Sequence, residues 1–451
     1  MRKWIAIFGA AGIVAATLPF LRHHDGAVAD LLAKAKLLSR DGAEGGKRGG
    51  NVDPPALTDV DLASIDDRRD VAVAPAHGRR NAELTLVADY QRAAVSYLRN
   101  NGLYEGSIVM SDVKTGRIMA WANYNQGRPR DVASEATAPS ASVFKIITGT
   151  ALVEAGVPLN EKFCYAGGEH RVTLRDLEPD EKRDKYCATL PMALGRSLNT
   201  IFARQARAHL DGEKLLGAAQ RYGYNLDIPF DVPVKKSTLE IPEEELEFAR
   251  TAAGFWHSTL SPFQGNNIVL TLANGGEMIR STIVARVLDE DGEEIYAAPE
   301  GRQVFKRVLD PRTAAAVTRM MEQTVRNGSG FKAFHDRAGR PYLPDIEVAG
   351  KTGTLAKADP SSLYTWFVAF APSRAPEVAL SVLVVNRGKW QVKAAELASR
   401  MLRIYFANKG APGVTYPPGY QGTRRPTTPA PAAVAAQAAP TALPPDSDDG
   451  G

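Results

Sequence analysis

Cysteine, histidine and an excess of either charge are all scarce in this chain. Its 451 residues include two cysteines and seven histidines, and none of the histidines lies in a recognisable nucleophile motif. Basic and acidic residues nearly balance, at 55 and 51, so the sequence lacks the concentrated basic stripe that nucleic-acid binding requires. We therefore expect neither a histidine-based catalytic triad nor a nucleic-acid partner.

Long hydrophobic runs are also missing, with one exception at the start of the chain. Residues 4–21 carry no charge and follow two basic residues, and a membrane span needs about 20 apolar residues. We expect residues 1–21 to be a single-pass membrane anchor, with the rest of the chain in the periplasm or extracytoplasmic space. A cleaved signal peptide is the alternative, because residues 27–29 read Ala-Val-Ala. The charged stretch 22–25 favours the uncleaved anchor.

Two further segments lack the composition of a folded domain. Residues 22–80 include a glycine-rich string followed by proline and aspartate, which predicts a linker. Residues 409–451 are rich in proline and alanine and predict a disordered tail. The remaining region, 81–408, has the ordinary balance of apolar and charged residues of a globular domain.

The order of predicted elements in 81–408 indicates an α+β fold. Strand-like runs come early and late in this region, and helical patterns dominate between them. The predicted elements are a helix at 89–100, a hairpin of 107–111 and 117–122, helical sequence at 143–216, strands at 347–350, 365–370 and 378–385, and a closing helix at 392–406. We expect an antiparallel sheet, built from both ends and flanked by helices, beside an inserted all-helical lobe.

The string Ser142-Val-Phe-Lys145 is the first of three candidate catalytic motifs. It opens a predicted helix, and residues three apart share a helical face, so the Lys145 amine can reach the Ser142 hydroxyl. A serine hydroxyl needs a base to become a good nucleophile. A lysine serves as that base if burial and a nearby positive charge lower its pKa, and Lys351 would supply the charge.

The second motif, Ser197-Leu-Asn199, lies in predicted helical sequence. We expect Ser197 to relay a proton between Lys145 and the leaving group. We expect the Asn199 amide to orient Lys145 and to hold a substrate amide.

The third motif, from Lys351 to Thr354 (Lys-Thr-Gly-Thr), lies on a predicted strand. The small Gly353 allows this strand to approach the reacting carbonyl closely. The N–H groups of Ser142 and Thr354 would form an oxyanion hole, and the hydroxyls of Thr352 and Thr354, with Lys351, would bind a substrate carboxylate.

Each motif alone is weak, because 111–114 also fits S-x-x-K and 114–116 also fits K-T-G. Those copies lie in the predicted hairpin, where the same residues are ordinary turn formers. The order of the three motifs, each in its proper predicted setting, is what identifies the site.

With these motifs, residues 84–406 resemble the transpeptidase domain of penicillin-binding proteins. Supporting strings are LTLVADYQRAA, GSIVMSDVKTGRIMAWA, the segment from Ala253-Gly254-Phe255 through Ser261-Pro262, the Ala-Asn-Gly-Gly at 273–276 and AGKTGT. The resemblance implies a D,D-transpeptidase that acts on peptidoglycan stem peptides through an acyl-serine, needs no cofactor and is blocked covalently by β-lactams. The sequence has no room for a glycosyltransferase or pedestal module, so we expect a monofunctional member.

Other functions of such a site remain open. A D,D-carboxypeptidase would use water in place of the amine acceptor, and the motifs do not choose between the two. A β-lactamase requires efficient deacylation, and no Glu-x-x-x-Asn motif for a hydrolytic water is evident between the second and third motifs. A β-lactam sensor is the non-enzymatic alternative, disfavoured by the intact motifs and the single predicted span.

The two cysteines, Cys164 and Cys187, flank a polar segment just before the second motif. In an exported domain such a pair predicts a disulfide. Two free thiols, or a metal site with His170 and Asp184, are the alternatives, although the spacing follows no standard zinc pattern. We therefore expect no metal.

Overall fold

The structure, a computed structural model, describes residues 57–408 except 128, 168–170, 359–360 and 389. The expected anchor at 1–21 and tail at 409–451 lie outside these residues. None of the helices in the described ranges is both long enough and apolar enough to span a membrane.

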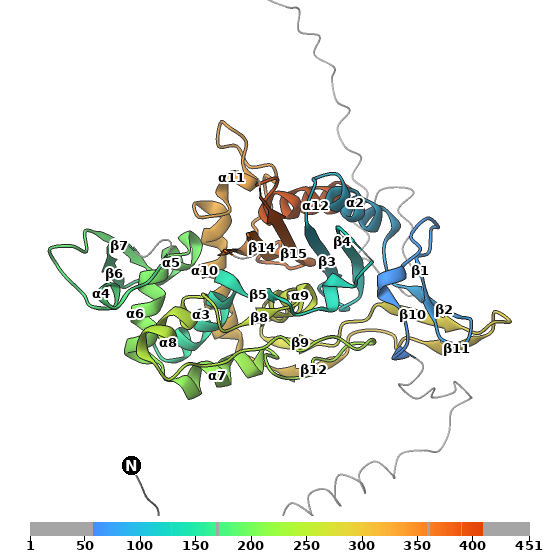
Figure 1. Cartoon of the computed structure of the whole chain (residues 1–451), viewed down its shortest axis with the longest axis horizontal. Coiled ribbons are helices and arrows are strands. Elements are labelled where there is room, and N and C mark those ends of the chain that lie inside the picture. The colour runs from blue at the N-terminus through green and yellow to red at the C-terminus, as the bar shows by residue number, and fades with distance from the viewer. Residues whose placement is uncertain (1–56, 128, 168–170, 359–360, 389, 409–451) are drawn as a thin grey trace, which may run out of the picture. The chain divides into compact units, whose positions relative to one another are not determined.

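A five-stranded antiparallel sheet forms the centre of the described structure, in the order β13-β14-β15-β3-β4 (Figure 1). Two strands come from the first part of the domain and three from the last, as predicted. Their bounds are β3 Glu105–Asp112, β4 Ile118–Asn125, β13 Ala349–Lys357, β14 Ser362–Ala371 and β15 Val378–Arg387. The predicted α+β class is confirmed, since the sheet and its helices derive from both ends of the sequence.

Helices cover both faces of this sheet (Figure 1). On β3, Ile108 and Met110 pack in one apolar cluster with side chains of two helices, whereas Val109 faces the opposite cluster. This alternation buries both faces of the strand and explains its unbroken apolar run. The two helices on the first face are α2 (Ala88–Arg99) and α12 (Ala394–Asn408), and α9 (Pro262–Ala273) covers the other.

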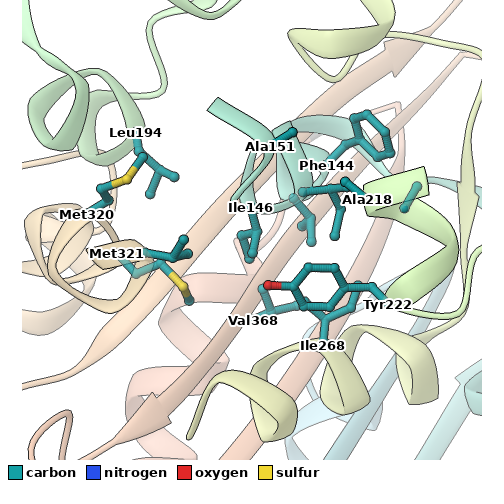
Figure 2. Packing of buried hydrophobic residues seen from close by; sticks show 14 of the residues in the cluster. Phe144, Ile146, Ala151, Leu194, Ala218, Tyr222, Ile268, Met320, Met321 and Val368 are labelled. Atoms are coloured by element: carbon teal, nitrogen blue, oxygen red, sulfur yellow. The ribbon is translucent and has the colours of Figure 1, made fainter. Parts of the chain in front are cut away.

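A helical lobe lies between the two halves of the sheet in the sequence. Its helix α3 (Lys145–Glu154) is buried over most of its circumference, because side chains from several elements surround it. Figure 2 shows this packing, in which Ile146 and Ala151 lie among Leu194, Ile268, Met320, Met321 and Val368. The other long helices of this region are α5 Leu190–Arg196, α6 Asn199–His209, α7 Gly212–Arg221, α8 Glu245–Ala252 and α10 Pro311–Arg326.

The lobe differs from the all-helical expectation in one detail. A short hairpin, β6 (Lys162–Tyr165) with β7 (Tyr186–Thr189), interrupts the predicted helical sequence. Each strand is four residues long and contains an aromatic residue and a cysteine, which is too short a pattern to read as β from sequence. The cross-strand pair Cys164–Cys187 fixes its register.

The predicted linker is partly folded, so its boundary at residue 80 is wrong. Strands β1 (Val73–Ala76) and β2 (Arg80–Leu84) belong to a second antiparallel sheet, together with β10 (Val284–Leu288) and β11 (Glu294–Ala297). The strand order is β1-β2-β10-β11. Leu57, Val60 and Leu62 are buried in the apolar cluster beneath it. These apolar residues are spread thinly among charged ones, so overall composition concealed them.

The remaining described elements are short. They are η2 Leu62–Ser64, η3 Val132–Ser134, β5 Ala138–Pro139, η4 Ala141–Phe144, α4 Leu174–Leu177, β8 Thr259–Leu260, β9 Glu277–Ile279, β12 Val304–Arg307 and α11 Phe331–Phe334. Among them, η4 is the turn that carries Ser142 into α3.

Candidate active site

Ser142 lies in a tight turn rather than in an α-helix. The turn is the 3₁₀ segment η4, and α3 begins only at Lys145. In a 3₁₀ turn residues three apart are eclipsed, which aligns the two side chains. Lys145 Nζ lies 2.9 Å from Ser142 Oγ, as the sequence predicted. Ala141, just before Ser142, has a φ of 49°, a left-handed conformation that a non-glycine residue adopts at some energetic cost.

Lys145 is fully buried, and two oxygens accept its N–H groups. They are Asn199 Oδ1 at 2.7 Å and the Ala253 carbonyl at 2.5 Å. Burial lowers the pKa of Lys145 well below its usual value, and the positive charge of Lys351 lowers it further. A neutral amine has two protons and one lone pair. With both protons on those two oxygens, the lone pair faces the Ser142 hydroxyl, so Lys145 is arranged to act as a general base.

Ser197 caps the end of α5, directly before α6. Its φ of 61° is left-handed, which turns the chain between the two helices. Its Oγ accepts a hydrogen bond of 2.9 Å from Lys351 Nζ. Asn199, two residues later, is the first residue of α6 and is buried against Lys145. The second motif therefore contacts both lysines.

Strand β13 brings the third motif to the nucleophile. Lys351 is fully buried, and burial lowers its pKa to about 7. A Cβ added at Gly353 would lie 3.3 Å from the Ala141 Cβ and 3.1 Å from the Trp366 Cβ, so the strand packs closely against the residue before Ser142. The approach of this strand to a reacting carbonyl stays a prediction. Thr354 follows as an exposed residue at this edge of the sheet. The oxyanion role of the Ser142 and Thr354 N–H groups stays a prediction.

Two neighbours of the nucleophile have roles that the sequence did not suggest. Ala253 supplies a carbonyl to Lys145, and Gly254 lies against the turn that holds Ser142. Gly254 has a φ of +79°, and a Cβ there would overlap the Ala141 carbonyl oxygen and lie 3.0 Å from the Ser142 Cα. In the sequence Ala253-Gly254-Phe255, only the glycine indicated an unusual backbone conformation.

Ser329 connects Gly195 of α5, two residues before the second motif, to Thr352 of the third motif. Its backbone N–H and its hydroxyl both lie within hydrogen-bond distance of the Gly195 carbonyl, at 2.9 and 3.0 Å. The same hydroxyl lies 2.5 Å from Thr352 Oγ1. The string 327–330 forms a turn that packs between α5 and β13.

A groove of about 550 Å³ lies beside the site. Its lining includes Pro139, three residues before Ser142, and Lys357, three residues after Thr354. Tyr364 also lines it, whereas Trp366, on the same strand, is buried and donates its indole N–H to the Pro139 carbonyl. The groove is therefore lined by residues close in sequence to the first and third motifs.

The cysteine prediction is confirmed, because Cys164 and Cys187 form a disulfide. Asp184, considered as a metal ligand, instead pairs with Arg204 at 2.6 Å, and His170 lies outside the described residues. Across the described ranges, no three histidine, cysteine or acidic side chains gather in a way that could hold a metal ion.

The duplicate motif at 111–114 is structural. Ser111 is buried on β3, and its hydroxyl donates to Asn266 Oδ1 at 2.8 Å. Lys114 is exposed in the turn that follows. The two residues therefore form no second catalytic pair, in agreement with the sequence interpretation.

Comparison with known proteins identifies the family. The family described as penicillin binding protein transpeptidase domain matches residues 106–403, roughly two thirds of the chain. The chain belongs to this family.

Named relatives share this region at low identity. Peptidoglycan D,D-transpeptidase PbpA of Mycobacterium tuberculosis H37Rv is 25% identical over 350 residues, which cover 75% of this chain and 68% of the relative. PbpA of Mycolicibacterium smegmatis is 24% identical over 347 residues, covering 68% of each chain.

Solved structures share the fold. The D,D-transpeptidase domain of a peptidoglycan glycosyltransferase from Eggerthella lenta matches with a TM-score of 0.60 and 24% identity, covering 73% of this chain and 83% of that one. PBPA from M. tuberculosis matches with a TM-score of 0.60 and 23% identity, covering 74% and 81%. This agreement shows the same architecture despite the low identity.

Proposed function

We propose that this chain is a serine D,D-transpeptidase that cross-links peptidoglycan stem peptides through an acyl-serine intermediate. The observation that carries the proposal is the buried Lys145 amine, which lies 2.9 Å from the Ser142 hydroxyl with its pKa lowered well below normal. The names of the PbpA relatives, both peptidoglycan D,D-transpeptidases, support the same activity.

In the acylation step, Ser142 Oγ attacks the carbonyl of the D-Ala-D-Ala bond and gives its proton to Lys145. The Oγ–C bond forms, and the developing oxyanion lies near the Ser142 and Thr354 N–H groups. The C–N bond then breaks, and the proton that Lys145 took from Ser142 passes through Ser197 to the departing D-alanine amine, which leaves Lys145 neutral again. Ser197 is held for this relay by its hydrogen bond from Lys351. This sequence leaves an acyl-serine and free D-alanine.

The transfer step reverses these roles. The amine of a neighbouring stem peptide loses a proton to Lys145 and attacks the acyl carbonyl, the Oγ–C bond breaks, and Ser142 Oγ recovers a proton. Lys351, with the hydroxyls of Thr352 and Thr354, holds the terminal carboxylate of the donor during acylation. The groove beside Pro139 and Lys357 offers room for the extended peptide.

The proposed setting is the outer face of a cell membrane. The uncharged run at 4–21 supports a single-pass anchor, and the disulfide supports an oxidising, exported location. β-Lactams would act as covalent inhibitors because they present a carboxylate and a reactive amide to the same groups.

Covalent labelling with a fluorescent penicillin tests the proposed function. We expect label on Ser142 that persists for many minutes, and none in Ser142→Ala. Ser111→Ala is the matched control, because it removes the buried hydroxyl of the duplicate motif, and it should label normally. Label that is unchanged in Ser142→Ala would reject the assignment, and rapid loss of label with drug turnover would instead indicate a β-lactamase.

A pentapeptide ending in D-Ala-D-Ala separates transpeptidase from carboxypeptidase. The peptide is incubated with the protein and an amine acceptor, and the products are measured by mass spectrometry. A cross-linked product that forms at the expense of the hydrolysed one supports the transpeptidase. Hydrolysis alone, at every acceptor concentration, would indicate a carboxypeptidase.

A further inference from the structure

Helix α6 begins at Asn199, the residue that fixes one N–H of Lys145. The position of α6 therefore decides where the Lys145 lone pair points. The disulfide-bonded hairpin β6–β7 contacts this helix. Two side chains of α6, those of Arg204 and Thr200, bond to the hairpin or to the residues just after β6.

Arg204, five residues after Asn199, is the main connection. Its side chain is 8% exposed, and its guanidinium donates to the carbonyls of Cys164 (3.0 Å), Asp176 (2.6 Å) and Glu178 (3.0 Å). It also pairs with Asp184 at 2.6 Å. One buried guanidinium thus joins α6 to β6, to α4 and to the segment that leads into β7.

A second bond lies next to the catalytic residue itself. Thr200, the residue after Asn199, is fully buried, and its hydroxyl donates to the Gly167 carbonyl at 3.1 Å. Gly167 lies two residues after the end of β6 in the sequence. The first turn of α6 is therefore tied to the same strand end that Arg204 holds.

The other strand of the hairpin leads to the other side of the second motif. Strand β7 ends at Thr189 and runs without a break into α5, whose C-cap is Ser197. Arg204 of α6 bonds to β6, and β7 continues into α5. The disulfide Cys164–Cys187 links these two strands. This small disulfide-bonded hairpin therefore holds both α5, whose C-cap is Ser197, and α6, which begins at Asn199.

We propose that Arg204 is a positioning residue, which acts with the Cys164–Cys187 disulfide to hold Asn199 Oδ1 on Lys145. The proposal rests on the proposed acyl-serine chemistry. Without the bonds of Arg204 and the disulfide, α6 shifts, and Asn199 Oδ1 no longer accepts a hydrogen bond from Lys145. The Lys145 lone pair then no longer points steadily at Ser142, so acylation slows while the non-covalent binding of substrate changes little.

The test measures acylation by a chromogenic cephalosporin as a rate constant and a separate binding constant. We expect Arg204→Gln to lower the acylation rate constant about tenfold, because small misplacements of catalytic groups are costly, while the binding constant stays within twofold of the parent. Thr200→Val, which removes only a hydroxyl, should give a smaller loss of the same kind. The double variant Cys164→Ser with Cys187→Ser should also slow acylation, and so should reduction of the parent protein, since both cysteines are exposed.

Arg207→Gln is the matched control. Arg207 lies on the same helix, but it is more exposed and bonds to the Leu177 carbonyl, Glu178 and Glu245 rather than to β6. This variant should acylate like the parent.

A double-mutant cycle with Asn199→Ala separates positioning from general destabilisation. If Arg204 acts through Asn199, then Arg204→Gln should slow acylation no further in the Asn199→Ala background. Additive losses, or an unchanged acylation rate constant in folded Arg204→Gln, would overturn the proposal. If Arg204→Gln does not fold, the same double-mutant cycle is made with Thr200→Val and Asn199→Ala. This cycle, together with the acylation rate of the reduced parent protein, then tests the proposal. Absence of label in the parent would instead count against the proposed function.

Discussion

Lys351 Nζ donates a 2.9 Å hydrogen bond to Ser197 Oγ, across 154 residues of sequence. Lys145, also fully buried, lies close enough that the charge of Lys351 lowers its pKa. Burial alone lowers the pKa of Lys351 to about 7. Burial favours the neutral form of both amines, and the charge of Lys351 favours the neutral form of Lys145 further. A neutral Lys145 is available as a base, and the protonated form of Lys351 is available to bind an anion.

The first prediction concerns pH. We expect the second-order acylation constant for a penicillin to fall as the pH rises through about 7, because Lys351 then loses the charge that binds the carboxylate. The sign follows from a lowered lysine pKa, which leaves the ammonium form dominant only below that value. Stopped-flow acylation between pH 5 and 9 measures this. A penicillin methyl ester is the control, and an equal alkaline decline for the ester would contradict the role of Lys351.

The second prediction concerns Asn199→Asp. A carboxylate in place of the amide would lie about 2.7 Å from Lys145 Nζ and would raise the pKa of that lysine. We expect acylation at neutral pH to slow by about 100-fold, the lower end of what general base catalysis contributes. Rate measurements at increasing pH should recover part of the loss. A variant with the parent rate and pH profile would show that Asn199 does not control Lys145.

The third prediction concerns Gly254→Ala. Both its left-handed φ and the overlap with Ala141 oppose a side chain here, so the turn carrying Ser142 must move. We expect acylation to fall by about 100-fold. Gly156→Ala is matched, because Gly156 has a φ of +83° but nothing within 4 Å of its Cβ. Thermal unfolding should show that both variants lose about 1–2 kcal/mol of stability, because each places a side chain on a left-handed backbone. The loss of acylation should be confined to Gly254→Ala.

The fourth prediction concerns Ser329. Ser329→Ala removes the hydroxyl that touches Thr352 but leaves the backbone N–H bond to Gly195. We expect the binding constant for β-lactams to weaken about fivefold, equivalent to one hydrogen bond of about 1 kcal/mol. The acylation rate constant should change less than the binding constant. Ser329→Thr, which keeps the hydroxyl at an exposed position, should restore binding, and failure to do so would argue against the hydroxyl contact.

Much of the fold could be predicted because its signals are local. The hairpin of β3 and β4, the three late strands and the closing helix each follow from a short run of apolar residues with the appropriate period. The folded segment from Leu57 was missed for the opposite reason. Its strands are short: β1 pairs with β2, and β2 pairs with β10, some 200 residues later. Composition cannot show a pairing between such distant segments.

The candidate active site likewise contains features that the sequence could predict and others that it could not. The pairing of Ser142 with Lys145 follows from a spacing of three, and the disulfide follows from an even pair of cysteines in an expected exported domain. Ser329 and Ala253 could not be found in this way. Ala253 acts through its backbone carbonyl, and Ser329 lies in an ordinary turn sequence, so neither carries a side-chain signature.

The amino-acid sequence by itself determined which groups are available: a serine with a lysine one turn away, a serine and an asparagine two residues apart, and a lysine ahead of a small residue on a strand. Only the tertiary structure decided their chemistry. The low pKa values of Lys145 and Lys351 arise because helices and strands from distant parts of the chain exclude water from both amines. Exclusion of water depends on every neighbouring segment at once, so no local pattern encodes it.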